Sequence, residues 1–176
     1  MAGVRDAVDR LRRAGGGNLG RGLAAVNEAV WWVTLVDATL LRYHPDVYDA
    51  ALASHGEGER RAVEDVLAGL RFVRNQMGYE IDPADFITRA GGRAGAARGR
   101  VGGWVWRSLP APALESVAPR RRRWEMTRYR AYEARLAGRT VGETFAGAAS
   151  FLELTFARTA APRADSPQGS HAQALP

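Results

Sequence analysis

The sequence predicts an all-α, single-domain bundle of about five or six helices, two of them long. Three observations lead to this prediction. Apolar residues recur at steps of three and four in several segments, as they do on one face of an α-helix. Glycines and prolines separate these segments. The chain of 176 residues is long enough for one domain with a substantial core.

The first predicted helix spans Val4 to Arg13, where apolar residues three and four positions apart form one face. Three successive glycines at 15–17 end it, because glycine loses the most backbone entropy when a helix forms. The side chain of Asn18 is then placed to cap the next helix.

A long helix is predicted from Leu19 to Tyr43, with apolar residues around most of its circumference. Such a helix is expected to be central, with neighbours on at least two sides. Its longest apolar run, Ala29 to Leu41, contains Asp37 and is too short to cross about 30 Å of hydrocarbon. The predicted core stripe is Leu23, Val26, Val30, Val33 and Leu40, widened by Trp31, Trp32, Leu35 and Leu41.

The next segment is delimited by proline and glycine. Pro45 ends the long helix, because the residue before a proline is pushed out of the α region. Asp46 to Ser54 is predicted to be a short helix, and residues 55–58 a turn. The inward residues of this helix are expected to be Val47, Ala51 and Leu52.

A second long helix is predicted from Arg60 to Ile81. Arg74 lies at the edge of its apolar seam, where an arginine is half buried and pairs with an acid or binds an anion. Glu28 and Asp37 are candidate partners, because a buried acid needs a cation or a hydrogen-bond donor. Residues 83–87, which begin with a proline, are predicted to form a further short helix. The seam consists of Val63, Val66, Leu70, Val73 and Met77.

Residues 89–103 form a predicted basic loop, with six glycines and four arginines and no apolar period. The segment Trp104-Val105-Trp106 that follows is predicted to be extended and to pack its tryptophans on the helical core. A single strand here has no obvious partner, so no sheet is predicted.

Two more helices are predicted after Pro119, spanning Arg120 to Ala137 and Val141 to Ala157. Gly138 ends the first, and Thr140 with Glu143 has the spacing of a capping box for the second. The domain is expected to span residues 1–158, and residues 159–176 to be a disordered tail. The inward residues of the last helix are predicted to be Val141, Phe145, Ala148, Leu152 and Phe156.

Composition excludes several classes of protein. The chain has no cysteine, which excludes disulfide scaffolds, thiolate zinc sites and cysteine nucleophiles. Its three histidines stand in unrelated contexts, so neither a metal site nor a cofactor is predicted. The N-terminus lacks the apolar stretch of a secretory signal, so a cytoplasmic location without membrane association is expected.

Positive charge is concentrated in one part of the chain. Residues 89–139 carry 13 arginines and 3 acidic residues, a net charge of +10, whereas residues 1–88 carry −3 and residues 140–176 carry −1. Arginines interleaved with aromatic residues suit phosphate contacts and base stacking, although most charged helix faces are merely solvated. The candidate nucleic-acid contacts are Arg71, Arg120, Arg121, Arg122, Arg123, Trp124 and Arg128.

Arg74 and Asn75, near the end of a long helix in a helical pattern over residues 19–88, resemble the motif of the HEPN (higher eukaryotes and prokaryotes nucleotide-binding) domains. In that family an arginine is followed, after four to six residues, by a histidine. The resemblance implies a metal-independent ribonuclease formed across a homodimer, in which the arginine stabilises charge on the scissile phosphate and the histidine moves a proton. Tyr79 stands at the first of the possible histidine positions, and Glu80 and Ile81 at the others.

The missing histidine leaves the proton-transfer role to Tyr79, and a tyrosine has an ordinary pKa of about 10. Either the site is catalytically degenerate, or a nearby cation activates Tyr79, or the chain is not a HEPN domain. A purely structural alternative pairs Arg74 with Glu28 or Asp37 and uses Asn75 to cap its helix. The preferred prediction is a HEPN-like, dimeric, RNA-associated or defence/toxin-type module. The alternative is a non-enzymatic interaction module with an acidic protein partner.

We expect the protein to cleave RNA slowly or not at all, because no histidine stands at the motif position. If the resemblance holds, Tyr79→His creates activity by restoring the spacing from arginine to histidine. The measurement is metal-free cleavage of a fluorescent RNA. Fast cleavage by the unaltered protein that survives Arg74→Ala would contradict the assignment of catalysis to this helix.

Overall fold

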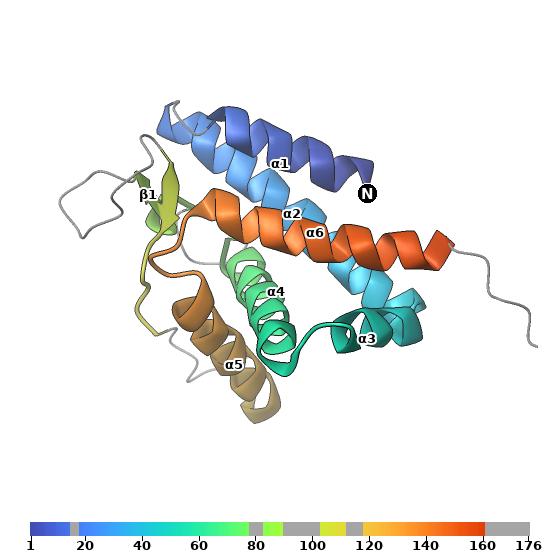
Figure 1. The fold of residues 1–176 in the computed structure, drawn as a ribbon. Coiled ribbons are helices and arrows are strands. Elements are labelled where there is room, and N and C mark those ends of the chain that lie inside the picture. The colour runs from blue at the N-terminus through green and yellow to red at the C-terminus, as the bar shows by residue number, and fades with distance from the viewer. Residues whose placement is uncertain (15–17, 78–82, 90–102, 112–117, 161–176) are drawn as a thin grey trace, which may run out of the picture.

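The computed structural model describes residues 1–14, 18–77, 83–89, 103–111 and 118–160. Six α-helices and one small two-stranded sheet occur in these residues, which confirms the predicted all-α, single-domain bundle (Figure 1). The helices are α1 (Ala2–Ala14), α2 (Leu19–Tyr43), α3 (Pro45–Ala53), α4 (Glu57–Met77), α5 (Pro119–Arg135) and α6 (Val141–Ala160). A 3-10 helix, η1 (Pro83–Asp85), precedes the strands β1 (Ile87–Arg89) and β2 (Trp104–Trp106).

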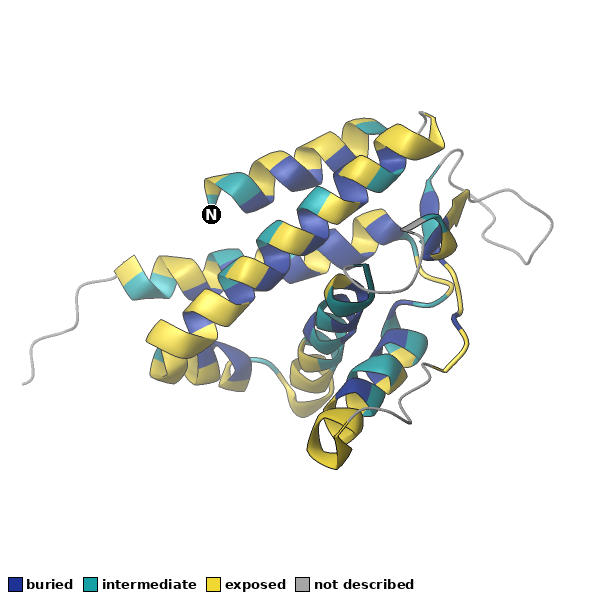
Figure 2. Cartoon of the chain, turned by 180° about the vertical axis from the view of Figure 1, so that it is seen from behind, coloured by how far each residue is buried: buried dark blue, intermediate teal, exposed yellow. Residues whose placement is uncertain are grey.

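Helix α2 is central, as predicted, and packs against α1, α3, α4 and α6. The Asn18 Oδ1 accepts a hydrogen bond from the Gly20 N–H at 2.6 Å, which confirms the predicted cap. By length and composition α2 would also suit a membrane span, but here its apolar stripe forms part of the core. The helix is not buried most of the way round, because its neighbours cover only part of it (Figure 2). Trp31, Leu35 and Leu41 are exposed at the surface.

Helix α4 begins at Glu57 rather than Arg60. The turn predicted over residues 55–58 was therefore two residues too long, because residues 57 and 58 belong to the helix. Glu57 and Glu59 explain the earlier start, because acidic side chains in the first turn interact favourably with the helix dipole. The described part of the helix ends at Met77, and residues 78–82, including Tyr79, lie outside the described residues.

The prediction that no sheet forms was wrong. Strand β1 pairs antiparallel with β2, with Ile87 opposite Trp106 and Arg89 opposite Trp104. The predicted helix over 83–87 is therefore shorter, because Ile87 belongs to the strand. Trp104 and Trp106 are buried against the helices as predicted, and the Trp106 indole N–H donates to the Thr144 hydroxyl at 3.0 Å. Most of the predicted basic loop, residues 90–102, lies outside the described residues.

Helix α6 is capped as predicted, since the Thr140 Oγ1 accepts a hydrogen bond from the Glu143 N–H at 3.3 Å. The preceding turn contains Gly138 at a φ of 76°, a left-handed conformation that favours glycine. Phe156 is exposed, contrary to its predicted inward position, and Thr155 is buried instead. A step of three residues from Leu152 stays on the buried stripe, whereas a step of four leaves it. The helix continues to Ala160, and residues 161–176 lie outside the described residues.

A buried carboxylate joins three helices. Asp37 of α2 is fully buried, and its Oδ2 accepts from the Nε and Nη2 of Arg71 on α4 at 2.6 and 2.5 Å. The Tyr48 hydroxyl of α3 donates to the other carboxylate oxygen at 2.7 Å. Burial, and then the charge of Asp37, raise the pKa of Tyr48, so this hydroxyl keeps its proton and remains a donor.

We expect Asp37→Ala to lower the free energy of unfolding by about 3–5 kcal/mol, because it leaves the guanidinium of Arg71 without its charge partner. The measurement is urea denaturation followed by circular dichroism. The matched control is Glu64→Ala, which breaks the exposed pair of Arg60 with Glu64 and should cost about 0.5 kcal/mol. Equal losses in the two variants would contradict a structural role for the buried carboxylate.

Candidate functional site

Helices α4 and α5 run antiparallel and lie side by side (Figure 1). Asp65 near the start of α4 pairs with Arg135 at the end of α5, and Asn75 near the end of α4 contacts Glu125 of α5. Between these contacts Gly69 lets the backbones approach closely, since a Cβ there would lie 3.1 Å from the Tyr132 Cα. The sequence therefore brings the end of α4 to the arginine-rich beginning of α5.

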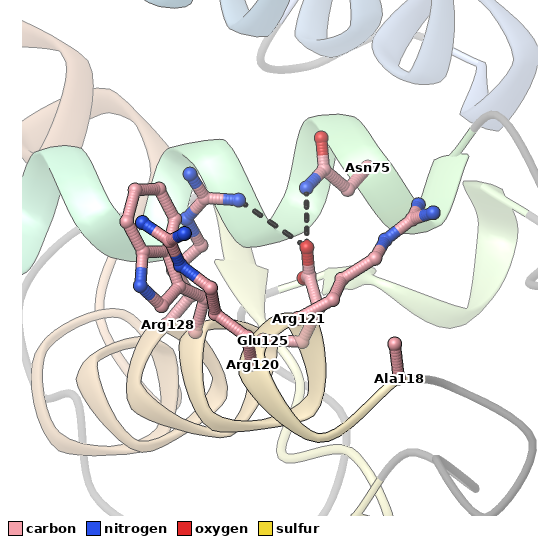
Figure 3. Close-up of a pocket in the computed structure, with 7 residues that line it drawn as sticks. Asn75, Ala118, Arg120, Arg121, Glu125 and Arg128 are labelled. Carbon is pink, nitrogen blue, oxygen red and sulfur yellow. Dashed lines mark hydrogen bonds and ion pairs between the residues drawn. The ribbon is translucent and has the colours of Figure 1, made fainter.

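A pocket of about 540 Å³ lies where these two helix ends meet (Figure 3). Five of the residues predicted to contact nucleic acid or to form the catalytic motif come together here. Figure 3 shows Arg120 and Arg128 on one side of the Glu125 carboxylate and Arg121 reaching out on the other. The lining residues are Asn75, Ala118, Arg120, Arg121, Trp124, Glu125 and Arg128.

The carboxylate of Glu125 is the only acidic group among these lining residues, and the residue is 7 % exposed. Its Oε1 accepts from the Asn75 Nδ2 at 2.9 Å and from the Arg128 Nη1 at 3.2 Å. Its Oε2 accepts no hydrogen bond from any described residue. The Arg128 guanidinium also lies over the Trp124 ring, 5.6 Å from its centroid, so one arginine links the carboxylate to the indole.

The beginning of α5 favours a negatively charged ligand. Ala118 occupies the N-cap position and provides no side-chain hydrogen bond, and the first turn contains no acidic residue. The helix dipole gives this end a partial positive charge. Arg120 and Arg121 add full positive charges there, so an anion would relieve their repulsion.

Arg74 does not pair with Glu28 or Asp37, and that structural alternative was wrong. The acids are bound by other arginines: Glu28 by Arg10, with an Nε to Oε2 distance of 2.7 Å, and Asp37 by Arg71. Helical spacing indicated that Arg74 faces α2. It did not show whether the arginine contacts the carboxylates of α2 or the exposed aromatic ring of the same helix. The Arg74 guanidinium lies over the ring of Trp31, 4.9 Å from the centroid.

Of the other predicted site residues, Asn75 lines this pocket, whereas Arg71, Arg122 and Arg123 do not. Asn75 bonds to Glu125 instead of capping its helix. Arg71 is bound to Asp37, and Arg122 and Arg123 are exposed on α5 outside the pocket lining. For Arg71, Arg122 and Arg123 a contact with nucleic acid stays a prediction.

Sequence reasoning missed Glu125, which lines the pocket. A signal was present, because Glu125 is the only acidic residue between Arg120 and Arg130. An isolated acid among arginines indicates either a local ion pair or a hydrogen-bond acceptor for a ligand. Among the described residues, no group of three or more His, Asp or Glu side chains is placed to hold a metal ion.

No protein-family model, curated protein sequence or solved structure matches this chain significantly. The resemblance of Arg74 and Asn75 to the HEPN motif therefore stays a prediction.

We expect Gly69→Ala to destabilise the protein by about 1–3 kcal/mol, because the new methyl group presses on the backbone of α5 at Tyr132. The matched control is Gly147→Ala on α6, which is exposed and has open space around it. That change should stabilise the protein by about 0.5–1 kcal/mol through backbone entropy. Thermal unfolding measures both, and stabilisation by Gly69→Ala would contradict the close packing of α4 on α5.

Proposed function

We propose that this chain is an RNA-binding module that uses the pocket between α4 and α5. The observation that carries the proposal is the convergence of Arg120, Arg121 and Arg128 with an exposed tryptophan at the N-terminus of α5. Each group suits a different part of a single-stranded nucleotide. Phosphates attract arginine guanidinium groups and helix N–H groups, and bases stack on aromatic rings.

The phosphate of a bound nucleotide contacts Arg120 and Arg121 in this proposal, because these side chains extend from the first turn of α5. Trp124 supplies the stacking surface, since it is 58 % exposed although it is a large apolar side chain. Arg128 is held against both the indole and Glu125, so its guanidinium is ordered before a ligand arrives. Ordering a side chain in advance reduces the entropy lost on binding.

The proposal retains the HEPN-like assignment as a cytoplasmic, homodimeric, RNA-associated or defence/toxin-type module. It is a proposal of binding rather than of efficient cleavage, because the histidine of the family motif is absent at residues 79–81. It is supported by the position of Asn75, one of the two motif residues, in the lining of the pocket.

An acidic protein partner is the second candidate. It is favoured by a separate surface of α2, where Trp31 and Leu35 are exposed and Arg74 lies over the Trp31 ring. Exposed aromatic and arginine side chains are enriched in protein interfaces. A partner of this kind would bind whether or not the pocket arginines were present, which separates the two candidates experimentally.

We expect the protein to bind a fluorescent 12-nucleotide RNA with an affinity that falls steeply with salt. Replacing Arg120 and Arg121 by glutamine should reduce the slope of log K against log salt by roughly 1.4, from two lost phosphate contacts on a single strand. Trp124→Ala should weaken binding by about 1–3 kcal/mol through lost stacking. Fluorescence anisotropy over a salt series measures both effects.

The control replaces Arg12 and Arg13, which are exposed in the last turn of α1, by glutamine. This variant loses the same charge far along the sequence from the pocket and should keep most of the affinity and slope. Binding that is equally weak in both double variants would indicate attraction by net charge alone. Undetectable RNA binding, with binding of an acidic peptide instead, would favour the second candidate.

A further inference from the structure

The free oxygen of Glu125 is an unusual feature of the pocket. The side chain is more than nine-tenths buried, and its Oε2 accepts no hydrogen bond from the described residues. Oε1, in contrast, accepts from both Asn75 and Arg128. A buried acceptor without a donor is costly, and a carboxylate oxygen has two lone pairs to offer. A ligand with N–H groups would recover that cost.

A simple anion does not satisfy this pocket. Phosphate suits Arg120, Arg121 and the N-terminus of α5, but the carboxylate of Glu125 repels it. The pocket therefore favours a ligand that carries a negative group at one end and hydrogen-bond donors at the other. Nucleotides have this arrangement, with the phosphate at one end and N–H groups on the edge of the base.

We propose that Glu125 reads the base of the bound nucleotide and that the pocket selects guanine and rejects uracil. This inference rests on the proposed RNA binding and specifies which residue gives that binding its selectivity. Guanine presents two adjacent donors, the N1–H and the N2 amino group, and carboxylates accept hydrogen bonds from such base edges. Uracil presents one N–H between two carbonyl oxygens, which the carboxylate repels.

The stacking surface of Trp124 and the carboxylate of Glu125 lie close enough together to contact the same nucleotide. Arg128 lies 5.6 Å from the centroid of the Trp124 ring and donates to Glu125 at 3.2 Å, so one guanidinium spans the distance between stacking surface and acceptor. Oε2 is not exposed to solvent in the structure. Rotation about the last side-chain bond of a glutamate is soft. A half turn would only exchange the two equivalent oxygens, so a smaller rotation is the one that exposes Oε2 to the bound base.

The test compares four RNA heptamers. Each has uridine at every position except the central one, where the base is G, A, C or U. Fluorescence anisotropy at one salt concentration should show the G-containing RNA binding about tenfold more tightly than the all-uridine RNA, as expected for a hydrogen bond to a charged group. Inosine in place of G lacks the N2 amino group and should lose most of this preference. The inosine comparison uses the unaltered protein, so it does not depend on a variant folding.

Glu125→Gln should bring the ratio of G to U affinity close to one, because an amide offers uracil a donor as readily as it offers guanine an acceptor. Glu59→Gln, an equal change of charge at an exposed position of α4, should keep the ratio. Two results would overturn base reading while leaving RNA binding in place. One is equal binding of all four heptamers. The other is a preference for G that persists both when inosine replaces G and in the Glu125→Gln variant. If none of the heptamers binds, the proposed function fails as well.

Discussion

The contact between Asp37 and Arg71 is the interaction on which the rest of the arrangement depends. Asp37 has no access to water, so its charge is stable only where the guanidinium of Arg71 and the Tyr48 hydroxyl meet it. These donors come from α4 and α3, and the carboxylate comes from α2. The pair therefore fixes the position of α4 on the central helix more strictly than apolar packing alone would. If α4 shifted along α2, a buried charge would be left unpaired.

Helix α4 passes this constraint on to the pocket. Four residues after Arg71, Asn75 donates to Glu125 of α5, while Phe72 packs its ring against Tyr129 and Tyr132. Helix α5 contacts α4 more extensively than it contacts any other helix, so its arginine-rich beginning is positioned largely by α4. The pocket thus shares α4 with the buried ion pair, which α4 makes through Arg71, while Asn75 of the same helix contacts Glu125 in the pocket.

The sequence predicted what depends on local periodicity. Helix α2 has the predicted bounds, and Asn18 and Thr140 cap their helices as expected, because burial stripes and caps are encoded within a few residues. Contacts between distant segments were harder to predict. Spacing indicated that an arginine of α4 faces the acids of α2, but Arg71 and Arg74 differ by less than a turn, and only packing decides between them. The sheet escaped prediction because β1, the partner of the segment predicted to be extended, has only three residues, too few to show alternation.

The pocket shows the same division between local pattern and long-range contact. The arginines and Trp124 were recognisable as a set because they share one helix, whereas the role of Glu125 depends on Asn75, fifty positions earlier in the chain. A carboxylate among arginines lowers attraction for any polyanion, since it cancels one of the three positive charges that line the pocket. The same carboxylate orders the guanidinium of Arg128, so it favours binding in one respect and opposes it in another. Its presence is understandable if discrimination between ligands matters more than affinity, because an acceptor that repels the wrong base edge provides selectivity that arginines alone cannot.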